Sequence, residues 1–319
     1  MYHSQPIFEP GPAHPSCHAA TLVELPDIHG IICPIVTPFN EENLIDLECT
    51  RRVVDFLLSR QIDCLMVGGT TGEGMLLSVA ERKTLCEAVI EHVAGRAPVI
   101  AHTGCISTAD TIELTRHAER TGATAASVVT PYYFTLDDDA LFGHFVSIAK
   151  AVPDFPTFLY TIPANARNDV SSALLKRLLG AAPNIVGMKA SNPDLMRLQE
   201  YIEAGGERFI VLNGVDGLML PALALGAVGQ VSGNSNVFPE TFRALYDAFM
   251  AGDVERARSL QQLINRIRVV FKDGITPAYF KAGLNLRGVP AGRVRPPLRE
   301  LTAEESKEVK RQLGALGLI

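Results

Sequence analysis

Eight short runs of apolar, mostly β-branched residues recur along the chain, and most gaps between them have a helical pattern. The runs are 31–36, 64–67, 98–101, 126–129, 157–160, 185–189, 209–212 and 228–231. In the segments 47–58, 79–93, 108–120 and 173–179, apolar residues return every three or four positions, which is the helical period. This alternation predicts an α/β fold, a parallel sheet closed into a (β/α)8 TIM barrel. A doubly wound open sheet would usually carry a glycine fingerprint after its first strand, and residues 34–39 contain none.

Helical patterns continue after the last apolar run, at 240–251, 254–270, 277–286 and 303–313. They exceed what a barrel needs and predict a C-terminal helical appendage. We therefore expect an irregular N-terminal extension over 1–27, the barrel over 28–238, and C-terminal helices packed on the barrel over 239–319.

Composition excludes several classes of protein. The net charge is -6 and there is no basic stripe, which argues against a nucleic-acid binder. No apolar stretch approaches the roughly 18 residues of a membrane-spanning helix. The first lysine or arginine is Arg51, so no signal peptide is expected, and the six cysteines are scattered without a C-x-x-C pair. These features predict a cytoplasmic protein with reduced thiols.

Lys189 stands directly after the apolar residues 185–188. Burial disfavours a charged ammonium, and a neutral lysine amine can attack a carbonyl to form a Schiff base. Ser191 lies two residues further on, so both side chains point into the barrel if the strand continues, while Met188 and Ala190 point outward. The alternative is that the strand ends at Met188 and the ammonium reaches solvent.

Two other groups of residues at predicted strand ends carry suitable chemistry. The loop Gly68–Gly74 follows the second run, and its backbone N–H groups, including that of Gly69, can converge on an anion together with the hydroxyls of Thr70 and Thr71. It lacks the ending of a nucleotide P-loop. Tyr133 follows the fourth run and Tyr160 ends the fifth, and a phenol can carry protons where water is excluded.

These motifs, in this order, resemble the pyruvate-dependent class I aldolases of the dihydrodipicolinate synthase and N-acetylneuraminate lyase superfamily. The resemblance runs from about residue 28 to 289. The segments that carry it are Gly69-Thr70-Thr71-Gly72-Glu73, Thr130-Pro131-Tyr132-Tyr133, Tyr160-Thr161-Ile162-Pro163, Val186-Gly187-Met188-Lys189 and Asn213-Gly214-Val215-Asp216.

The resemblance implies roles for individual residues. Lys189 would form the Schiff base with a 2-keto acid, and Tyr160 would shuttle protons. Thr71 and Tyr133 would link Tyr160 to solvent, with Tyr133 reaching in from a neighbouring subunit. Thr70 and Thr71 would hold the pyruvyl carboxylate.

Gly214 and Val231 match positions that line the pocket in the family. The resemblance further implies a homotetramer built as a dimer of dimers, with no metal and no organic cofactor.

Two departures bear on the substrate. The dihydrodipicolinate synthases carry an arginine two residues after the proline that ends the segment Tyr160-Thr161-Ile162-Pro163. This chain has Asn165 there, and an amide lacks the charged fork of a guanidinium. Arg167 could replace it only by a different loop path. Ser191 is a second departure, typical of sugar-acid lyases and 4-hydroxy-2-oxoglutarate aldolases.

We therefore expect cleavage or formation of a hydroxylated 2-keto acid, giving pyruvate and an aldehyde. Substrates of this kind are 4-hydroxy-2-oxoglutarate or a 2-keto-3-deoxy sugar acid. Dihydrodipicolinate synthesis from pyruvate and aspartate semialdehyde, and dehydration of a 2-keto-3-deoxy acid, remain open. A non-enzymatic keto-acid sensor is the contrasting class, although a sensor has no need of a nucleophile.

Two further groups are assigned to structure rather than to metal binding. His102 and Cys105 are expected to be packing residues, because no third ligand is evident. The acidic run 137–139 is expected to begin a helix.

Overall fold

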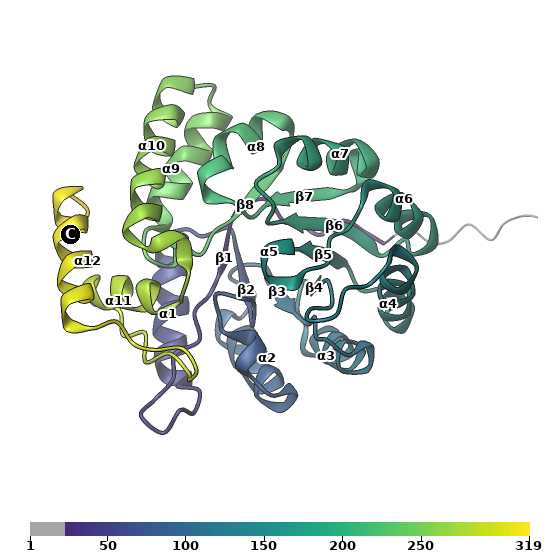
Figure 1. The fold of residues 1–319 in the computed structure, drawn as a ribbon, viewed down its shortest axis with the longest axis horizontal. Helices are drawn as coiled ribbons and strands as arrows, with labels where there is room; N and C mark the ends of the chain where they lie inside the picture. Colours follow the sequence, from purple (N-terminus) through teal and green to yellow (C-terminus); the bar gives the residue numbers. More distant parts are fainter. Residues whose placement is uncertain (1–22) are drawn as a thin grey trace, which may run out of the picture.

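The strands of the chain form one closed barrel in a computed structural model that describes residues 23–319. All eight strands pair in parallel in sequence order, and β1 closes the ring on β8 (Figure 1). The strands are β1 Gly30–Pro34, β2 Cys64–Val67, β3 Val99–His102, β4 Ala125–Val129, β5 Thr157–Thr161, β6 Ile185–Ala190, β7 Ile210–Asn213 and β8 Gly229–Val231. The predicted (β/α)8 barrel is confirmed.

Helices surround the barrel, and most begin where the sequence predicts. The α-helices that follow β1 to β7 are α1 Leu47–Ser59, α2 Val79–Val93, α3 Thr108–Thr121, α4 Asp138–Ala151, α5 Pro163–Ala166, α6 Ser172–Ala181, α7 Leu195–Gly205 and α8 Met219–Leu225. Asp137 caps α4 by accepting from the backbone N–H of Ala140 at 2.8 Å. Ser78 and Glu81 form a capping box on α2. These caps satisfy N–H groups that have no partner within the helix.

Side chains of the strands lie in two apolar layers, and their alternation is interrupted in β6, where the pairing with β5 skips Val186. In β6, Met188 and Ala190 pack among residues of α4, α6 and α7 outside the barrel, while Val186 faces the barrel interior with Phe158 of β5. Lys189 is buried, with 6% of its surface exposed, and lies within the strand rather than after it. The prediction that Lys189 points inward is confirmed.

Apolar residues fill the barrel interior toward the amino-terminal ends of the strands. Val23 and Leu25 pack against the interior cluster that contains Ile28 and Ile32. Arg208 donates to the carbonyl of Val23 at 3.2 Å. The described part of the predicted extension, 23–27, thus has no helix or strand but contacts the barrel, and residues 1–22 lie outside the described residues.

Four further α-helices follow β8 and lie along one flank of the barrel. They are α9 Pro239–Met250, α10 Val254–Val270, α11 Ala278–Leu286 and α12 Ala303–Ala315. In Figure 1, α9 and α10 stand side by side next to the barrel, and α12 lies at its outer edge. Thr302 and Glu305 form the predicted capping box on α12. No helix within residues 23–319 has both the length and the apolar character needed to cross a membrane.

A buried ion pair connects α11 to the loop after β2. Lys281 Nζ lies 2.6 Å from Glu73 Oε1, and both side chains are almost fully buried. Lys281 also donates to the carbonyls of Thr37 at 2.7 Å and Arg293 at 2.5 Å. Burial raises the pKa of Glu73 and lowers that of Lys281, each against the attraction of its partner. Each charge therefore depends on the other.

Replacing Lys281 by Met should lower the free energy of unfolding by about 3–5 kcal/mol, because Glu73 is then buried without a counter-ion. The double variant Lys281→Met with Glu73→Gln should recover much of this loss. Denaturant unfolding monitored by circular dichroism measures both. The exposed Lys307→Met is the matched control, and an equal effect in that variant would contradict the importance of the pair.

Candidate active site

Lys189 and Tyr160 face each other near the carboxyl ends of the neighbouring strands β6 and β5. Their Cα atoms are paired in the register of β5 and β6, and both side chains are buried. Lys189 Nζ lies 4.0 Å from the centroid of the Tyr160 ring. The hydroxyl of Tyr160 lies 3.4 Å from Thr70 Oγ1 in the loop after β2. A primary amine, a phenol and a hydroxyl thus meet in one place.

The pKa of Tyr160 lies below that of an ordinary tyrosine. Burial raises it, but the positive charge of Lys189 and polar contacts with Thr70, Lys189 and Ser191 together outweigh burial. The pairing of β5 with β6 brings Lys189 this close to Tyr160. A phenol in this setting gives up its proton more readily, which suits a group that carries protons.

These residues lie in a cavity of about 670 Å³. Eight of the ten site residues predicted from the sequence line it: Thr70, Thr71, Tyr160, Asn165, Lys189, Ser191, Gly214 and Val231. Its walls come from the loops after β2, β5, β6, β7 and β8, and also from the segment between α10 and α11. The cavity therefore opens at the carboxyl ends of the strands, where barrel active sites lie.

The loop after β2 is held close to the barrel by its glycines. A side chain on Gly74 would collide with the carbonyl of Gly68, and one on Gly72 would lie 2.7 Å from the carbonyl of Ile35. Thr37 donates its hydroxyl to the carbonyl of Gly72 at 2.6 Å. The tight path of this loop turns Thr70 and Thr71 toward the cavity.

Gly214 is needed because Ser191 occupies the space of a side chain. A Cβ on Gly214 would collide with Ser191 Oγ and would lie 3.2 Å from the carbonyl of Ala190. The N–H of Gly214 donates to that same carbonyl at 2.7 Å, and the N–H of Ser191 donates to Thr161 at 2.9 Å. Strand-like hydrogen bonding thus continues past Lys189 and directs Ser191 into the cavity.

Two predicted residues do not line the cavity of their own chain. The side chain of Tyr133 is 72% exposed on the surface, with its ring against Phe134 at a centroid distance of 5.0 Å. Gly69 contributes its carbonyl to a backbone hydrogen bond with Gly74. Arg167 is exposed and also lies outside the cavity lining, so it does not take the place of the arginine that Asn165 replaces.

Several polar residues of the cavity were not found from the sequence. Asp216 is buried and accepts from Gln230 at 2.8 Å, Ser232 at 2.8 Å and Asn234 at 2.5 Å. Burial raises the pKa of Asp216, while these three donors lower it and the net direction is upward. Arg268 of α10 adds a cation to the same wall. The motif Asn213-Gly214-Val215-Asp216 was the one sequence signal for this wall.

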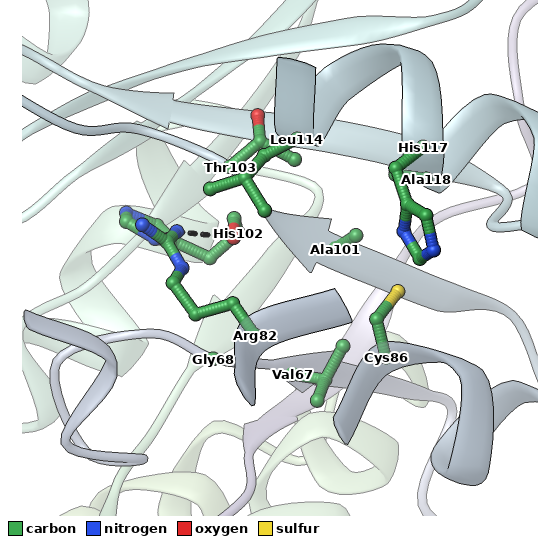
Figure 2. A pocket seen from close by; sticks show the side chains of 10 residues that line it. All are labelled: Val67, Gly68, Arg82, Cys86, Ala101, His102, Thr103, Leu114, His117 and Ala118. Atoms are coloured by element: carbon green, nitrogen blue, oxygen red, sulfur yellow. Dashed lines mark hydrogen bonds between the residues drawn. The ribbon is translucent and has the colours of Figure 1, made fainter. Parts of the chain in front are cut away.

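A second buried cluster lies beside the site (Figure 2). Arg82 of α2 donates to His102 Nδ1 at 3.0 Å and to the carbonyl of His102 at 2.6 Å. The ring of His102 meets that of Tyr160 edge to face at 5.8 Å. Burial and the charges of Arg82 and Lys189 lower the pKa of His102 well below its usual value, so the imidazole is neutral. It packs behind Tyr160.

The cysteine and acidic residues show no arrangement suited to a metal. Among residues 23–319, no group of three or more His, Cys, Asp or Glu side chains is close enough together to hold an ion. Cys105 Sγ lies 3.0 Å from Arg82 Nη1, and burial raises the pKa of this thiol. The five described cysteines are free thiols, and Cys17 lies outside the described residues.

The chain is similar to known proteins of one family. The model of the dihydrodipicolinate synthetase family matches residues 27–316. The chain is 37% identical over 291 residues to a 4-hydroxy-tetrahydrodipicolinate synthase of Thermus thermophilus, covering 91% of this chain and 97% of the relative. It is thus similar to that enzyme along nearly its whole length.

Solved structures agree with the family match. A dihydrodipicolinate synthase from Aquifex aeolicus superposes with a TM-score of 0.87 at 33% identity, covering 91% of this chain and 99% of that one. The E. coli K12 prophage protein YagE, of the same family and solved in complex with pyruvate, gives 0.88 at 31% identity, covering 92% and 100%.

The family match and the similar enzymes place the chain among the lyases. More particularly, the chain is a member of the dihydrodipicolinate synthetase family.

Replacing Gly214 by Ala should lower the free energy of unfolding by about 1–3 kcal/mol, because the new methyl group overlaps Ser191 Oγ. In a Ser191→Ala background most of this loss should disappear. Thermal or denaturant unfolding of the four proteins of the cycle measures the difference. Gly180→Ala, where a Cβ would meet nothing within 4 Å, is the control. An equal loss in both backgrounds would show that the contact is unimportant.

Proposed function

We propose that this protein is a Schiff-base lyase that splits a hydroxylated 2-keto acid into pyruvate and an aldehyde, or joins the two. One observation carries the proposal: a buried lysine amine lies 4.0 Å from the ring of a buried tyrosine, in a cavity large enough for a small acid. A pure binding protein has no need of this pair.

In the proposed reaction, Lys189 Nζ attacks the keto carbon of the substrate and a C–N bond forms. The keto oxygen takes one proton from the attacking nitrogen and becomes a hydroxyl. A second proton, which Tyr160 is placed to give, lets this hydroxyl leave as water, and the product is the protonated imine. Cleavage then breaks the C–C bond beyond C3, and its electron pair moves into the imine to give an enamine. The hydroxyl of the departing carbon loses its proton and becomes the aldehyde. Protonation of the enamine at C3 and hydrolysis of the imine by water then release pyruvate and restore the amine of Lys189. Tyr160 is placed to carry protons in these steps.

The carboxylate of the keto acid would bind at the loop after β2. Thr70 and Thr71 line the cavity there, and Thr70 already contacts the phenol of Tyr160. Oriented N–H and O–H donors stabilise an anion without adding a charge. The keto carbon would then lie between this loop and Lys189.

The proton path to solvent would be completed by a second copy of the chain. Tyr133 is exposed on the surface, on the loop after β4, and has a left-handed backbone with φ of 81°. We propose that it enters the cavity of a neighbouring subunit in a homotetramer and contacts Thr71 there.

The choice of a hydroxylated substrate rests on Asn165 and Ser191. Both line the cavity and offer neutral hydrogen-bonding groups. Since neither carries a charge, this part of the wall suits hydroxyl oxygens better than a second carboxylate.

Synthesis of 4-hydroxy-tetrahydrodipicolinate from pyruvate and aspartate semialdehyde is the second candidate. The names of the similar enzymes, including that of the Thermus thermophilus relative, favour it. The two functions are separated by supplying pyruvate with aspartate semialdehyde, and separately by following pyruvate release from 2-keto-3-deoxy and 4-hydroxy-2-keto acids. If pyruvate reacts with aspartate semialdehyde and none of the hydroxylated keto acids releases pyruvate, the second function replaces the first.

Reduction with borohydride in the presence of pyruvate should leave one pyruvyl adduct, located on Lys189 by peptide mass mapping. The imine is the species that borohydride traps, and Lys189 is the one lysine lining the cavity among the described residues. Lys189→Ala should give no adduct and no turnover. Pyruvate binding without an adduct would favour a keto-acid sensor, and retained turnover in Lys189→Ala would exclude the imine mechanism.

Tyr160→Phe should lower kcat roughly 10²-fold or more, because it removes the phenol that carries protons while preserving the ring beside Lys189. Steady-state kinetics measures this, and Tyr246→Phe, a half-buried tyrosine outside the cavity, is the control. The adduct should still form on Lys189 in Tyr160→Phe, though more slowly. A wild-type rate would assign Tyr160 to packing alone.

A further inference from the structure

The outer part of the cavity is built by the end of α10 and by the connection from α10 to α11. Arg268 from the last turns of α10 lines it, together with Asp273 and Gly274 of the 3-10 turn η5 Lys272–Gly274, and Ile275. These residues share one cavity with Lys189. A substrate whose keto group lies at Lys189 could therefore reach the wall formed by α10 and η5 with its far end.

Arg268 and Asp273 form an ion pair on this wall. Arg268 Nη2 lies 2.7 Å from Asp273 Oδ1, and about a quarter of the Arg268 side chain, 28%, is exposed. The guanidinium reaches over Gly217, where any side chain would collide with Nη1. The guanidinium has five N–H donors, and within residues 23–319 its close ionic partner is Asp273 alone. Donors of Arg268 and acceptor sites of Asp273 remain for a ligand.

The backbone of η5 is held in an uncommon conformation that presents Asp273. Lys272, Asp273 and Gly274 have φ values of 51°, 54° and 70°, three consecutive residues in the left-handed region. Two of them carry a Cβ, for which this region is unfavourable by roughly 1–2 kcal/mol each. Strain of this kind gathers at binding sites, where the surrounding structure maintains it.

The charge balance of the wall indicates which group it binds. Arg268 is already paired with Asp273, and the carboxyl group of Asp216 lines the same cavity, so a second carboxylate of a substrate would meet no unpaired positive charge on this wall. A hydroxyl group instead accepts from a guanidinium and donates to a carboxylate. An Arg–Asp pair is therefore complementary to neighbouring hydroxyls. Asn165 adds an amide to the lining of the same cavity.

We propose that Arg268 and Asp273 determine specificity by binding hydroxyl groups on the substrate carbons beyond the bond that is made or broken. The substrate is then a 2-keto acid with a polyhydroxylated tail rather than a dicarboxylate. This inference rests on the proposed function and deepens it. Arg268 donates to a tail hydroxyl, and Asp273 accepts from one.

The test compares condensation of pyruvate with three aldehydes: glyceraldehyde, which carries hydroxyls, propanal, which lacks them, and glyoxylate, which carries a carboxylate. The wild-type protein should prefer glyceraldehyde to propanal in kcat/KM by about 10–10²-fold, the factor expected for hydrogen bonds to a charged group. Arg268→Met should reduce this ratio about tenfold or more. Asp273→Asn should reduce it less, because an amide still accepts a hydrogen bond.

Matched variants separate recognition from structure. Arg266→Met, an exposed arginine on the same helix that does not line the cavity, should leave the ratio unchanged. Arg268→Lys keeps the charge and should keep part of the selectivity. An unchanged ratio in Arg268→Met, even if both rates fall, would overturn the proposal, since it would make the pair structural. A wild-type preference for glyoxylate that Arg268→Met removes would overturn the hydroxyl specificity in favour of a carboxylate.

Trapping with borohydride and pyruvate alone keeps the two proposals apart. Pyruvate has no tail, so the adduct on Lys189 should form in Arg268→Met as in the wild-type protein. Absence of the adduct from the wild-type protein would remove the proposed function itself, whereas an adduct with unchanged aldehyde ratios would remove the tail recognition alone.

Discussion

The buried ion pair between Glu73 and Lys281 is the interaction on which the shape of the cavity depends. Glu73 ends the loop that carries Thr70 and Thr71, and its backbone is left-handed with φ of 56°. Its second carboxylate oxygen accepts from the N–H of Arg295 at 2.8 Å. The loop is thus held by the segment that follows the barrel. Burying this ion pair costs free energy, and removing one partner costs more. The pair therefore fixes the loop after β2 relative to α11 and to the segment that contains Arg295.

Strand residues could be predicted from the sequence because their geometry is local. In a strand, side chains alternate, so an inward Lys189 implies an inward Ser191 and outward Met188 and Ala190. The sequence does not predict which residue of β5 lies opposite Lys189. Tyr160 is its neighbour because the pairing of β5 with β6 shifts by one residue between Thr157 and Phe158. Without that irregularity, Tyr160 would lie opposite Met188, and periodicity gives no sign of such a shift.

The remaining polar residues of the site could not be predicted because they depend on how distant segments dock. Arg268 reads in the sequence as one polar position of an amphipathic helix, and Asp273 as part of a short polar connection. What brings them to the cavity is the packing of α10 beside α9 and of η5 beside α10. Asp216 stood in a recognised motif, but its three donors come from β8 and the residues that follow it.

The two halves of the cavity are therefore under different constraints. The proposed imine chemistry needs Lys189 and Tyr160, which lie on the paired strands β6 and β5 inside the barrel. The proposed recognition of the substrate tail depends on Asn165 in the short helix α5, and on Arg268 and Asp273 outside the sheet. An identity of 37% spread over the chain consequently establishes the family, whereas the aldehyde depends on a few positions. Because Asn165 brings no charge and Arg268 is already paired, we expect the outer half of this cavity to bind hydroxyl groups better than a carboxylate.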